Sequence, residues 1–416
     1  MTKNIAIIGS GFVGLTLAAY LIKKTSENVY LYENDESKKI SLEKREYFVV
    51  EPELADLLNY GFDNKRLFFN TEVELSYVFI TIGTPKNFDN NFITEVLVPV
   101  CRDISHNLIL NGSVFLRSTI AIGVTNQVKE IFVSLGRKDV NVYFAPERTA
   151  EGVAVRELIL LPQIIGASSN SDIEVGAKVL ESLNFQLVKT TNAKTAELSK
   201  LICNTWRDVT FGYANEIANI SKYYDINAVE AIKAANENYP RSTVPLPGPV
   251  GGPCLTKDSY ILFSAFPGSE NSVILAARRI NEEFFLQIAE LISKLIIQCN
   301  IKKILLCGLA FKGFPKTNDY RNSLAEYLIK HFNHQSDIEL KFFDSDVSSL
   351  FTSDLNHLRV ESLKTFTPEL VVFCNNSKFF MSQEMESFLN IVGPIVIDTF
   401  QILSSSAGLE NRSYRK

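Results

Sequence analysis

The first 33 residues carry the pattern that most constrains the fold of this chain. Residues 4–8 are a short apolar run typical of a buried strand, and Gly9-Ser10-Gly11-Phe12-Val13-Gly14 follows directly. A helical stretch covers residues 15–24, and a second apolar run, 29–32, ends at Glu33. A strand, a GxGxxG turn, a helix and an acidic residue about 20 positions further on form the dinucleotide-binding fingerprint. The pattern therefore predicts an N-terminal Rossmann-like unit.

Each glycine of this turn, and the acid that follows the second strand, has a physical purpose. Gly9 permits a tight turn, Gly11 lets the backbone approach a pyrophosphate, and Gly14 lets the helix pack closely on the strand. Glu33 can accept hydrogen bonds from ribose hydroxyls and would repel a 2′-phosphate. The expected cofactor is therefore NAD and not NADP.

Composition narrows the class of protein. Of the 416 residues 46% are apolar and 21% are charged, which is typical of a globular chain and excludes a disordered one. The net charge of −5 gives no general footprint for nucleic acid or a membrane surface. No apolar run reaches transmembrane length, and the N-terminus has no signal-peptide pattern. We therefore expect a cytoplasmic protein that neither binds nucleic acid nor inserts into a membrane.

The six cysteines are scattered and show no CxxC spacing. A metal site or a disulfide framework is therefore not expected, and reduced thiols fit the pattern better.

Three more apolar runs end at polar side chains. Residues 77–82 lead to Thr84, residues 113–117 to Thr119, and residues 141–144 to Glu147. Ligands of a doubly wound sheet bind at the carboxyl ends of its strands, so these endings indicate one crevice. Each could equally be a turn or capping residue. The candidate cofactor-binding residues are Gly9, Gly11, Phe12, Val13, Gly14, Glu33, Thr84 and Thr119.

From residue 190 the pattern becomes helical. Residues 193–224 carry apolar side chains at helical spacing, and Lys200 and Asn204 lie one turn apart on one face. Asn204 has apolar neighbours, so we expect it to be partly buried and hydrogen-bonded. Residues 227–238 predict a further helix. The long helix predicted over 271–298 could join two domains or carry a dimer interface.

A single cysteine lies in the segment most suited to chemistry. Gly251 and Gly252 are expected to give a flexible approach, and Pro253 suits the first turn of a helix. Cys254 would then lie among the N–H groups of a helix N-terminus, where the dipole favours a thiolate. Asp258 follows one turn later, on the side of the sulfur. A lone cysteine is more often a small buried hydrophobic residue, so that interpretation stays open.

Strands and helices alternate again in the last third of the chain. Runs at 304–307, 340–343, 370–373 and 394–397 predict a second, smaller parallel sheet. The turn at 308–312 lacks GxGxxG spacing, so a second dinucleotide is not expected, although Lys312, Lys316 and Arg321 could meet a phosphate or a base. The predicted fold is α/β, with two Rossmann-like doubly wound parallel sheets joined by a helical middle domain with a long connecting helix. The expected domains are 1–190 for NAD, a helical domain over 191–300 and a second Rossmann-like domain over 301–416.

These motifs together resemble the UDP-glucose/GDP-mannose dehydrogenase family over nearly the whole chain. They are the turn from Gly9 to Gly14, Ile82-Gly83-Thr84-Pro85, Arg117-Ser118-Thr119, Pro146-Glu147-Arg148-Thr149-Ala150-Glu151-Gly152, Ala196-Glu197-Leu198-Ser199-Lys200 with Asn204, Gly251-Gly252-Pro253-Cys254 with Lys257-Asp258, and Gly308-Leu309-Ala310-Phe311-Lys312 with Asp319, Arg321 and Ser323.

The resemblance implies that residues 191–300 form the dimer and that residues 301–416 hold the nucleotide sugar. It also implies a four-electron reaction. The C6 alcohol of a UDP-sugar, either UDP-glucose or a UDP-N-acetylhexosamine, becomes a carboxylate while two NAD are reduced, supplying precursors of polysaccharides; a GDP-sugar remains an open alternative. The residues agree with this, because a nicotinamide site alone needs no thiol. Oxidation past the aldehyde does need one, since a thiolate forms a thiohemiacetal from which hydride can leave.

The resemblance also implies roles for individual residues. Cys254 matches the nucleophile and Asp258 the nearby carboxylate, with general-base or structural duty. Lys200 and Asn204 match residues that stabilise negative charge on the substrate oxygen. Further matched residues act on water or hold the substrate. Thr119, Glu147 and Glu151 match the water-handling positions, and the substrate-binding set is Glu147, Lys200, Asn204, Arg241, Gly251, Lys312 and Arg321. Arg241 resembles an arginine that reaches into the neighbouring subunit of a homodimer.

Three positions depart from the family pattern. Glu53 replaces a glycine, Ala121 a common proline, and Asn318 a common aspartate. They leave substrate and loop shape open more than the reaction. Two other functions stay open: a two-electron 2-hydroxyacid dehydrogenase of the related phosphogluconate type, and a non-catalytic NAD-binding paralogue that acts by dimerising.

Overall fold

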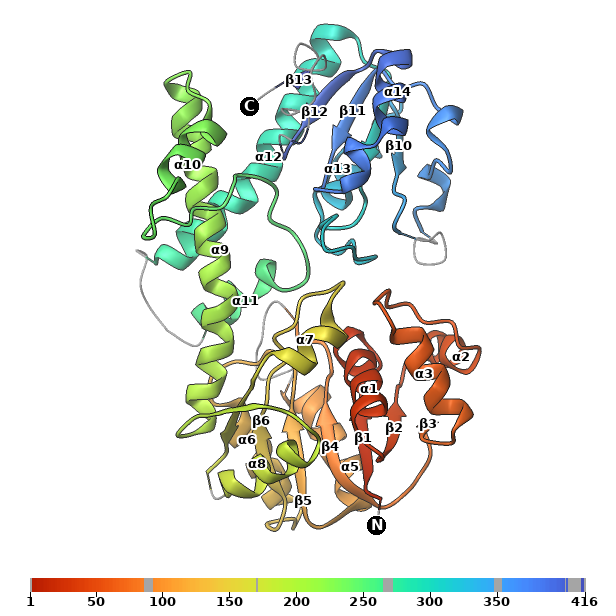
Figure 1. Cartoon of the computed structure of the whole chain (residues 1–416), viewed down its shortest axis with the longest axis vertical. Helices are drawn as coiled ribbons and strands as arrows, with labels where there is room; N and C mark the ends of the chain where they lie inside the picture. The colour runs from red at the N-terminus through yellow and green to blue at the C-terminus, as the bar shows by residue number, and fades with distance from the viewer. Residues whose placement is uncertain are drawn as a thin grey trace. The chain divides into compact units, whose positions relative to one another are not determined.

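The structure is a computed structural model that describes residues 2–85, 93–169, 171–264, 272–347, 354–400, 402 and 413–414. The chain divides into two compact units, whose elements are labelled in Figure 1. The first unit comprises Met1–Cys203 and Tyr260–Pro267, and the second comprises Asn204–Ser259 and Gly268–Lys416. The division into three domains stays a prediction.

The first unit is built on one eight-stranded sheet in the order β3-β2-β1-β4-β5-β6-β7-β8. Its first six strands have the Rossmann order 3-2-1-4-5-6. The strands are β1 (Asn4–Ile8), β2 (Asn28–Tyr32), β3 (Leu67–Phe69), β4 (Leu75–Ile80), β5 (Leu108–Leu116), β6 (Asn141–Phe144), β7 (Gln163–Ala167) and β8 (Leu187–Lys189). Every neighbouring pair is parallel except β6 with β7, which is antiparallel.

Helices cover both faces of this sheet, as Figure 1 shows. They are α1 (Phe12–Lys24), α2 (Glu36–Glu43), α3 (Leu54–Asp63), the π-helical turn η1 (Ile93–Leu97), α5 (Val98–Asn107), α6 (Val124–Ser134), α7 (Ala154–Leu160) and α8 (Ile173–Ser182).

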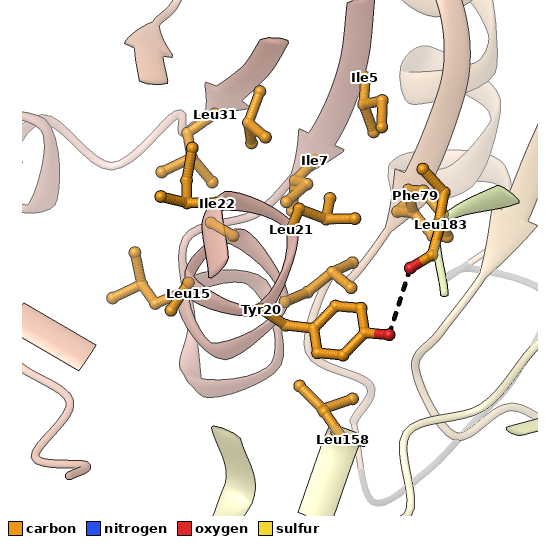
Figure 2. Packing of buried hydrophobic residues seen from close by; sticks show 14 of the residues in the cluster. Ile5, Ile7, Leu15, Tyr20, Leu21, Ile22, Leu31, Phe79, Leu158 and Leu183 are labelled. Carbon is orange, nitrogen blue, oxygen red and sulfur yellow. Dashed lines mark hydrogen bonds between the residues drawn. The ribbon is translucent and has the colours of Figure 1, made fainter. Parts of the chain in front are cut away.

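Helix α1 is buried almost all round, from Gly14 to Ile22. Figure 2 shows Leu21 and Ile22 facing the side chains of the central strands. Full burial of one such aliphatic side chain contributes about 1.5–3 kcal/mol. Tyr20, equally buried, donates its hydroxyl to the backbone oxygens of Leu183 (3.2 Å) and Asn184 (2.9 Å). Burial raises the pKa of Tyr20 to about 12, so the hydroxyl stays a donor. The helix that begins at the glycine turn is therefore firmly anchored.

The central helices are α9 (Ala193–Tyr223), α10 (Ala228–Asn236), α11 (Leu255–Ser264) and α12 (Val273–Cys299). Side chains cap two of them: Asn227 accepts from the first amides of α10, and Ser272 accepts from Leu275 at the start of α12. Within the second unit, α9 and α12 pack at very close range. A Cβ added to Gly212 would lie 2.7 Å from the Cβ of Ala277.

The second unit also holds a five-stranded, fully parallel sheet in the order β10-β9-β11-β12-β13. Its elements are β9 (Lys303–Cys307), α13 (Leu324–Phe332), β10 (Glu339–Phe343), the 3₁₀ turns η3 (Asn356–Leu358), η4 (Leu363–Thr365) and η5 (Lys378–Met381), β11 (Leu370–Phe373), α14 (Gln383–Val392), β12 (Ile395–Asp398) and β13 (Ser413–Tyr414). Continuous apolar strands such as Leu370–Phe373 are buried, as expected for parallel strands covered on both faces.

The predicted fold class is confirmed: the chain has two Rossmann-like sheets and a helical middle. The antiparallel pairing of β6 with β7 was not expected, so the first sheet is not purely parallel. Within the described part of the chain, no helix is long and apolar enough to cross a membrane.

Candidate active site

The glycine turn of the first unit has the backbone geometry that a dinucleotide needs. Gly9 has a φ of 101°, and its N–H donates to Tyr32 O at 2.8 Å. Thr81 closes the turn by donating its hydroxyl to the oxygens of Ile8 and Gly9 at 2.9 and 2.8 Å. A Cβ at Gly14 would lie 2.0 Å from Gly9 O, so no larger residue fits there.

Gly11 differs from the other two glycines because it faces open space. No atom lies within 4 Å of where its Cβ would be, and it precedes the first turn of α1. A ligand phosphate could therefore approach the backbone and the positive end of the helix dipole. Phe12 and Val13 form the first turn of that helix. This geometry fits NAD, which accepts a hydride when bound.

Glu33 lies where a ribose-binding acid is expected, at the end of β2. One of its oxygens accepts from the N–H (3.0 Å) and hydroxyl (2.6 Å) of Ser10, and the other from Asn34 N and Asp35 N. Partial burial would raise the pKa of Glu33, but the Ser10 and Asp35 hydrogen bonds outweigh it and lower the pKa. Glu33 is therefore an ionised acceptor held against the glycine turn.

The predicted site residue Glu147 forms a buried ion pair. Arg117, fully buried, donates to one Glu147 oxygen at 2.5 Å and to Gln163 at 2.8 Å. The other Glu147 oxygen accepts from Arg148 N and Thr149 N. Burial alone would raise the pKa of Glu147, but Arg117 and the Thr149 hydrogen bonds lower it. Sequence inspection missed this pair because the two partners lie 30 positions apart.

Two more carboxylates fix the segment that carries Glu151. Glu51, which is buried, accepts from Gly152 N and, at 2.9 Å, from Ala154 N. Glu157 accepts from Ala150 N at 2.7 Å. Glu151 therefore lies on a turn whose backbone is held on both sides. The predicted residues Thr84 and Thr119 follow β4 and β5 and are half-buried.

Glu197, near Lys200 in α9, has a role that spacing did not reveal. It is fully buried and accepts from Gly123 N (2.6 Å), Thr125 N (2.8 Å) and the Thr125 hydroxyl (2.6 Å), at the start of α6. It thus caps α6 and fixes the first turns of α9. Lys200, one turn further on, is also buried.

In the second unit the predicted helix is present as α11, but it starts at Leu255, so Pro253 and Cys254 lie just before its first turn and not within it. The Cys254 carbonyl accepts from Lys257 N (3.2 Å) and Asp258 N (3.0 Å), which makes Cys254 the cap of the helix. The Cys254 side chain is exposed, unlike those of Cys101, Cys307 and Cys374. An exposed thiol at a helix N-terminus is the environment in which cysteines react. The hypothesis of a buried hydrophobic cysteine does not hold for Cys254.

The expectation that Gly251 and Gly252 give a flexible approach was wrong. A Cβ on Gly251 would lie 2.3 Å from Asn322 O, and one on Gly252 would lie 2.7 Å from the ring of Phe311. Gly252 also has a φ of 89°. Asn322 additionally donates to Thr256 at 3.2 Å. The glycines are needed for tight packing, which holds the turn before the thiol in place.

The structure brings the predicted site residues Asp258 and Asn204 together. Asp258 is fully buried; its two oxygens accept from Asn204 Nδ2 (2.5 Å) and Lys257 Nζ (2.7 Å). Asn204 is buried too, one turn after Lys200 on α9. Its partner confirms that a buried Asn here is hydrogen-bonded. The second N–H of its amide leaves capacity to donate to a substrate oxygen.

The predicted substrate cations have different surroundings. Arg241 is exposed, with its guanidinium 4.8 Å above the ring of Tyr239. Arg321 is exposed and pairs with Asp319 at 2.5 Å. The Lys312 ammonium lies 5.6 Å from the ring centre of Phe311, the ring that Gly252 approaches. Lys312 and Gly251 therefore belong to neighbouring segments of the second unit.

The three departures from the family pattern differ in their surroundings. Glu53, which replaces a glycine, has a left-handed backbone with a φ of 64° and pairs with Lys23 at 2.7 Å. Ala121 accepts from Val124 N at the start of α6. Nothing in the structure explains Asn318. Among the residues the structure describes, no cluster of His, Cys, Asp or Glu could hold a metal ion.

The fold and the glycine turn define an NAD-dependent dehydrogenase of the Rossmann class. Comparison with known proteins identifies the family. The model of the UDP-glucose/GDP-mannose dehydrogenase NAD-binding domain matches residues 3–184, and that of the central domain matches residues 194–283. The chain belongs to the UDP-glucose/GDP-mannose dehydrogenase family, whose members are nucleotide-sugar dehydrogenases.

Individual relatives cover most of the chain. A UDP-N-acetyl-D-mannosamine dehydrogenase of Pyrococcus horikoshii is 34% identical over 77% of this chain and 79% of its own length. One of Methanocaldococcus jannaschii is 29% identical over 97% of this chain and 93% of its own. The solved Pyrococcus horikoshii structure has a TM-score of 0.82 at 27% identity and covers 95% of both chains. The solved structure of a UDP-N-acetyl-mannosamine dehydrogenase from Staphylococcus aureus also has a TM-score of 0.82. Its identity is 25%, and the match covers 97% of this chain and 96% of that one.

Proposed function

We propose that the protein oxidises the C6 hydroxyl of a UDP-sugar to a carboxylate, using two NAD and Cys254 as nucleophile. The observation that carries the proposal is an exposed cysteine capping α11, with the buried Asp258 one turn later bonded to Asn204 and Lys257. A dehydrogenase that stopped at the ketone or aldehyde would not need this thiol.

The chemistry proceeds in balanced steps. The alcohol loses a hydride and a proton and becomes an aldehyde. The Cys254 sulfur adds to the aldehyde carbon, a C–S bond forms, and the oxygen takes a proton, giving a thiohemiacetal. Loss of a second hydride and a proton gives a thioester. Water then breaks the C–S bond and releases the carboxylate and the thiol.

Lys200 and Asn204 are proposed to stabilise negative charge on the reacting oxygen. Both are buried and lie one turn apart on α9. A positive charge and an amide donor in a desolvated setting stabilise such charge more strongly than they would in water. Asp258 orients the Asn204 amide by accepting one of its N–H groups.

Of the three residues matched to water handling, Thr119 and Glu151 are proposed to handle the water used in proton transfer and hydrolysis, and Glu147 is proposed to have a different part. Because Arg117 and two backbone amides occupy both oxygens of Glu147, we assign it to shaping the segment. Glu151, on the segment so shaped, is the better candidate for moving the proton.

The names of the relatives favour an N-acetylhexosamine substrate, with UDP-N-acetyl-D-mannosamine as the first to test. We propose that Gly251, Lys312 and Arg321 contribute to holding the nucleotide sugar. We also propose a homodimer in which Arg241 reaches the neighbouring site, in keeping with its exposure. The location is proposed to be cytoplasmic, supported by six cysteines present as thiols.

The test is NADH formation on UDP-N-acetyl-mannosamine, UDP-glucose and GDP-mannose, with wild type, Cys254→Ala and Cys299→Ala. Cys299 is also exposed, so its variant is the matched control. We expect acid formation from a UDP-sugar by the wild type and Cys299→Ala, and none by Cys254→Ala. One NADH per sugar would favour the two-electron dehydrogenase, and NAD binding without turnover would favour the paralogue.

A further inference from the structure

We propose that Asp208 and Arg278, a buried ion pair in the second unit, position Cys254 for the second oxidation through Asn215, Asn281 and Ser259. The inference rests on the proposed function, because it concerns the thiol that this function uses. None of these five side chains is among the residues assigned above to the reaction or to substrate binding. They matter through the segment that they hold, residues 248–259.

The pair joins two helices that lie far apart in sequence. Asp208 of α9 is fully buried and Arg278 of α12 is 1% exposed; Arg278 Nη1 lies 2.9 Å from Asp208 Oδ1. Asn281, one turn after Arg278, donates to Asp208 Oδ1 at 2.8 Å and to Asp208 O at 2.9 Å. The Asp208 carboxylate is therefore the centre of a buried polar network.

The network is hydrogen-bonded to the segment that precedes Cys254. Arg278 Nη2 donates to Val250 O at 3.3 Å, four residues before Cys254. Asn215 makes a two-way contact with Gly248, donating to its oxygen at 3.1 Å and accepting from its N–H at 2.9 Å. The Asn215 amide also donates to Asn281 Oδ1 at 2.8 Å. Residues 248–250 are thus hydrogen-bonded to both α9 and α12.

The same network is hydrogen-bonded to the segment that follows Cys254. Ser259, buried on α11, donates its hydroxyl to Asp208 Oδ2 at 2.7 Å, five residues after Cys254. Asp258 beside it accepts from Asn204, one turn before Asp208 on α9. The segment is therefore held through backbone atoms at 248 and 250 and through side chains at 258 and 259, while the Cys254 side chain between these points is exposed.

Helix packing alone does not require this ion pair. The helices already meet at Gly212 and Ala277, and apolar residues of similar volume would often stabilise such a contact as well as a buried pair does. An apolar contact, unlike a hydrogen bond, does not fix the orientation of the segment that it touches. Hydrogen bonds to Val250 O, Gly248 and Ser259 set where the turn lies, and this is the property that a nucleophile needs.

The two oxidations differ in how much they depend on this placement. The first removes a hydride from the alcohol and forms no bond to sulfur. The second requires the sulfur to reach the aldehyde carbon, and a misplacement of about 1 Å can cost on the order of 100-fold in rate. Loosening the network should therefore release aldehyde before it is trapped.

The experiment compares four variants with the wild-type full-length protein. Ser259→Ala removes one tether, and Ser259→Thr restores a hydroxyl. The double variant Asp208→Leu/Arg278→Met removes both charges, so that no buried charge is left unpaired. Ser293→Ala is the control, because its hydroxyl bonds only within α12, to Ala289 O at 2.9 Å. The readouts are NADH per sugar, aldehyde trapped by hydroxylamine, alkylation of Cys254 by iodoacetamide, and the melting temperature.

We expect the Ser259→Ala and double variants to keep the first oxidation within about threefold, to form acid about 10- to 100-fold more slowly, and to release aldehyde. Ser259→Thr and Ser293→Ala should behave like the wild type. Alkylation of Cys254, but not of Cys299, should change at least about fivefold in the loosened variants.

The inference is overturned if folded Ser259→Ala forms acid without aldehyde and alkylates at the wild-type rate. Should the double variant fail to fold, the Ser259→Ala and Ser259→Thr pair decides. Absence of acid formation by the wild type would contradict the proposed function instead, and the alkylation rates would then still decide whether the network positions the thiol.

Discussion

The two sheets each carry a turn after a central strand, and the turns differ in how many of their backbone amides the acid at the end of the next strand binds. The turn after β1 leaves open space at Gly11, and the acid at the end of the next strand, Glu33, is only half-buried. The turn after β9 is closed by Asp344, 6% exposed, which accepts from Leu309 N (2.6 Å) and Ala310 N (3.1 Å).

The rest of the second turn is closed as well. The remaining Asp344 oxygen accepts from Asp346 N and Val347 N at 2.7 and 3.1 Å. The side chain of Asn375 fills the space at Gly308, coming within 2.5 Å of where a Cβ would be. The same succession of a strand, a turn and a next strand that ends in an acid thus gives one turn with room for a pyrophosphate and another whose amides are already bonded. The two acids differ in what they bind: Glu33 binds one amide of its turn, that of Ser10, and Asp344 binds two.

The largest effect should come from closing the first turn by substitution. In Gly14→Ala the added Cβ meets Gly9 O at 2.0 Å, so we expect loss of NAD binding and more than about 3 kcal/mol of destabilisation. Gly11→Ala is the matched comparison, because its Cβ meets nothing. It should keep the melting temperature but raise the KM for NAD about 10-fold, as the methyl group occupies the approach to the backbone. Thermal unfolding and NAD titration separate the two outcomes, and equal effects would break the comparison.

Opening the second turn should cost stability but not cofactor affinity. Asp344→Ala leaves buried amides without their acceptor, which should destabilise the protein by about 2–3 kcal/mol. The KM for NAD should be unchanged. Urea unfolding and NAD kinetics measure the two quantities. A gain of a second NAD in Asp344→Ala would show that the carboxylate alone closes the turn.

The two acids should also respond to pH with opposite sign. The pKa of Glu33 is lowered below its ordinary 4.5 by the Ser10 and Asp35 hydrogen bonds, against its partial burial. Its contribution to stability is therefore present above pH 4.5 and lost as pH falls through the folded-state pKa. Burial raises the pKa of Asp344 above its ordinary 3.8, despite four amide donors, so stability falls as pH rises from 3.8 through the folded-state pKa.

These signs are checked by measuring the free energy of unfolding from pH 3.5 to 6.5. The proteins compared are the wild type, Glu33→Gln and Asp344→Asn. The stability difference for Glu33→Gln should shrink on acidification, and that for Asp344→Asn should shrink as pH rises. Slopes of the same sign would contradict the contrast between the two acids.

The smallest effect concerns a left-handed position outside the turns. Both turns have a glycine at a left-handed position, Gly9 (φ 101°) and Gly308 (φ 93°), whereas Glu53, the residue before α3, has a φ of 64°. Glu53→Gly should relieve about 1 kcal/mol of backbone strain and lose less than about 1 kcal/mol from the exposed pair with Lys23. The net change in the free energy of unfolding should lie within about 1 kcal/mol and favour the variant. Glu53→Ala, which keeps the strain and loses the pair, should be the less stable of the two.

The sequence predicted those parts of the fold that local pattern determines. Strands Asn4–Ile8, Asn141–Phe144 and Leu370–Phe373 were predicted with their observed bounds, because each is a buried apolar run between polar residues. The strand Gln163–Ala167 was missed. It contains a glutamine that is buried only because Arg117 bonds it.

The site shows the same division. Pro253 predicted the helix that begins after Cys254, and spacing placed Lys200 and Asn204 on one helix. No spacing rule connects Asp208 with Arg278, which lie 70 positions apart, or Glu51 with Ala154, which lie 103 apart. Such partners are set by how helices and turns pack, and only coordinates bring them together. The roles assigned to the site residues remain predictions.

The central claim is that Cys254 becomes covalently bound to the sugar during turnover. Rapid acid quench of the wild type with NAD and its UDP-sugar, followed by peptide mass spectrometry, tests it directly. We predict that the Cys254 peptide transiently carries the mass of the UDP-uronyl group as a thioester, and that the Cys299 peptide does not. Acid formation at the full rate with no adduct on Cys254 at any quench time would contradict the account.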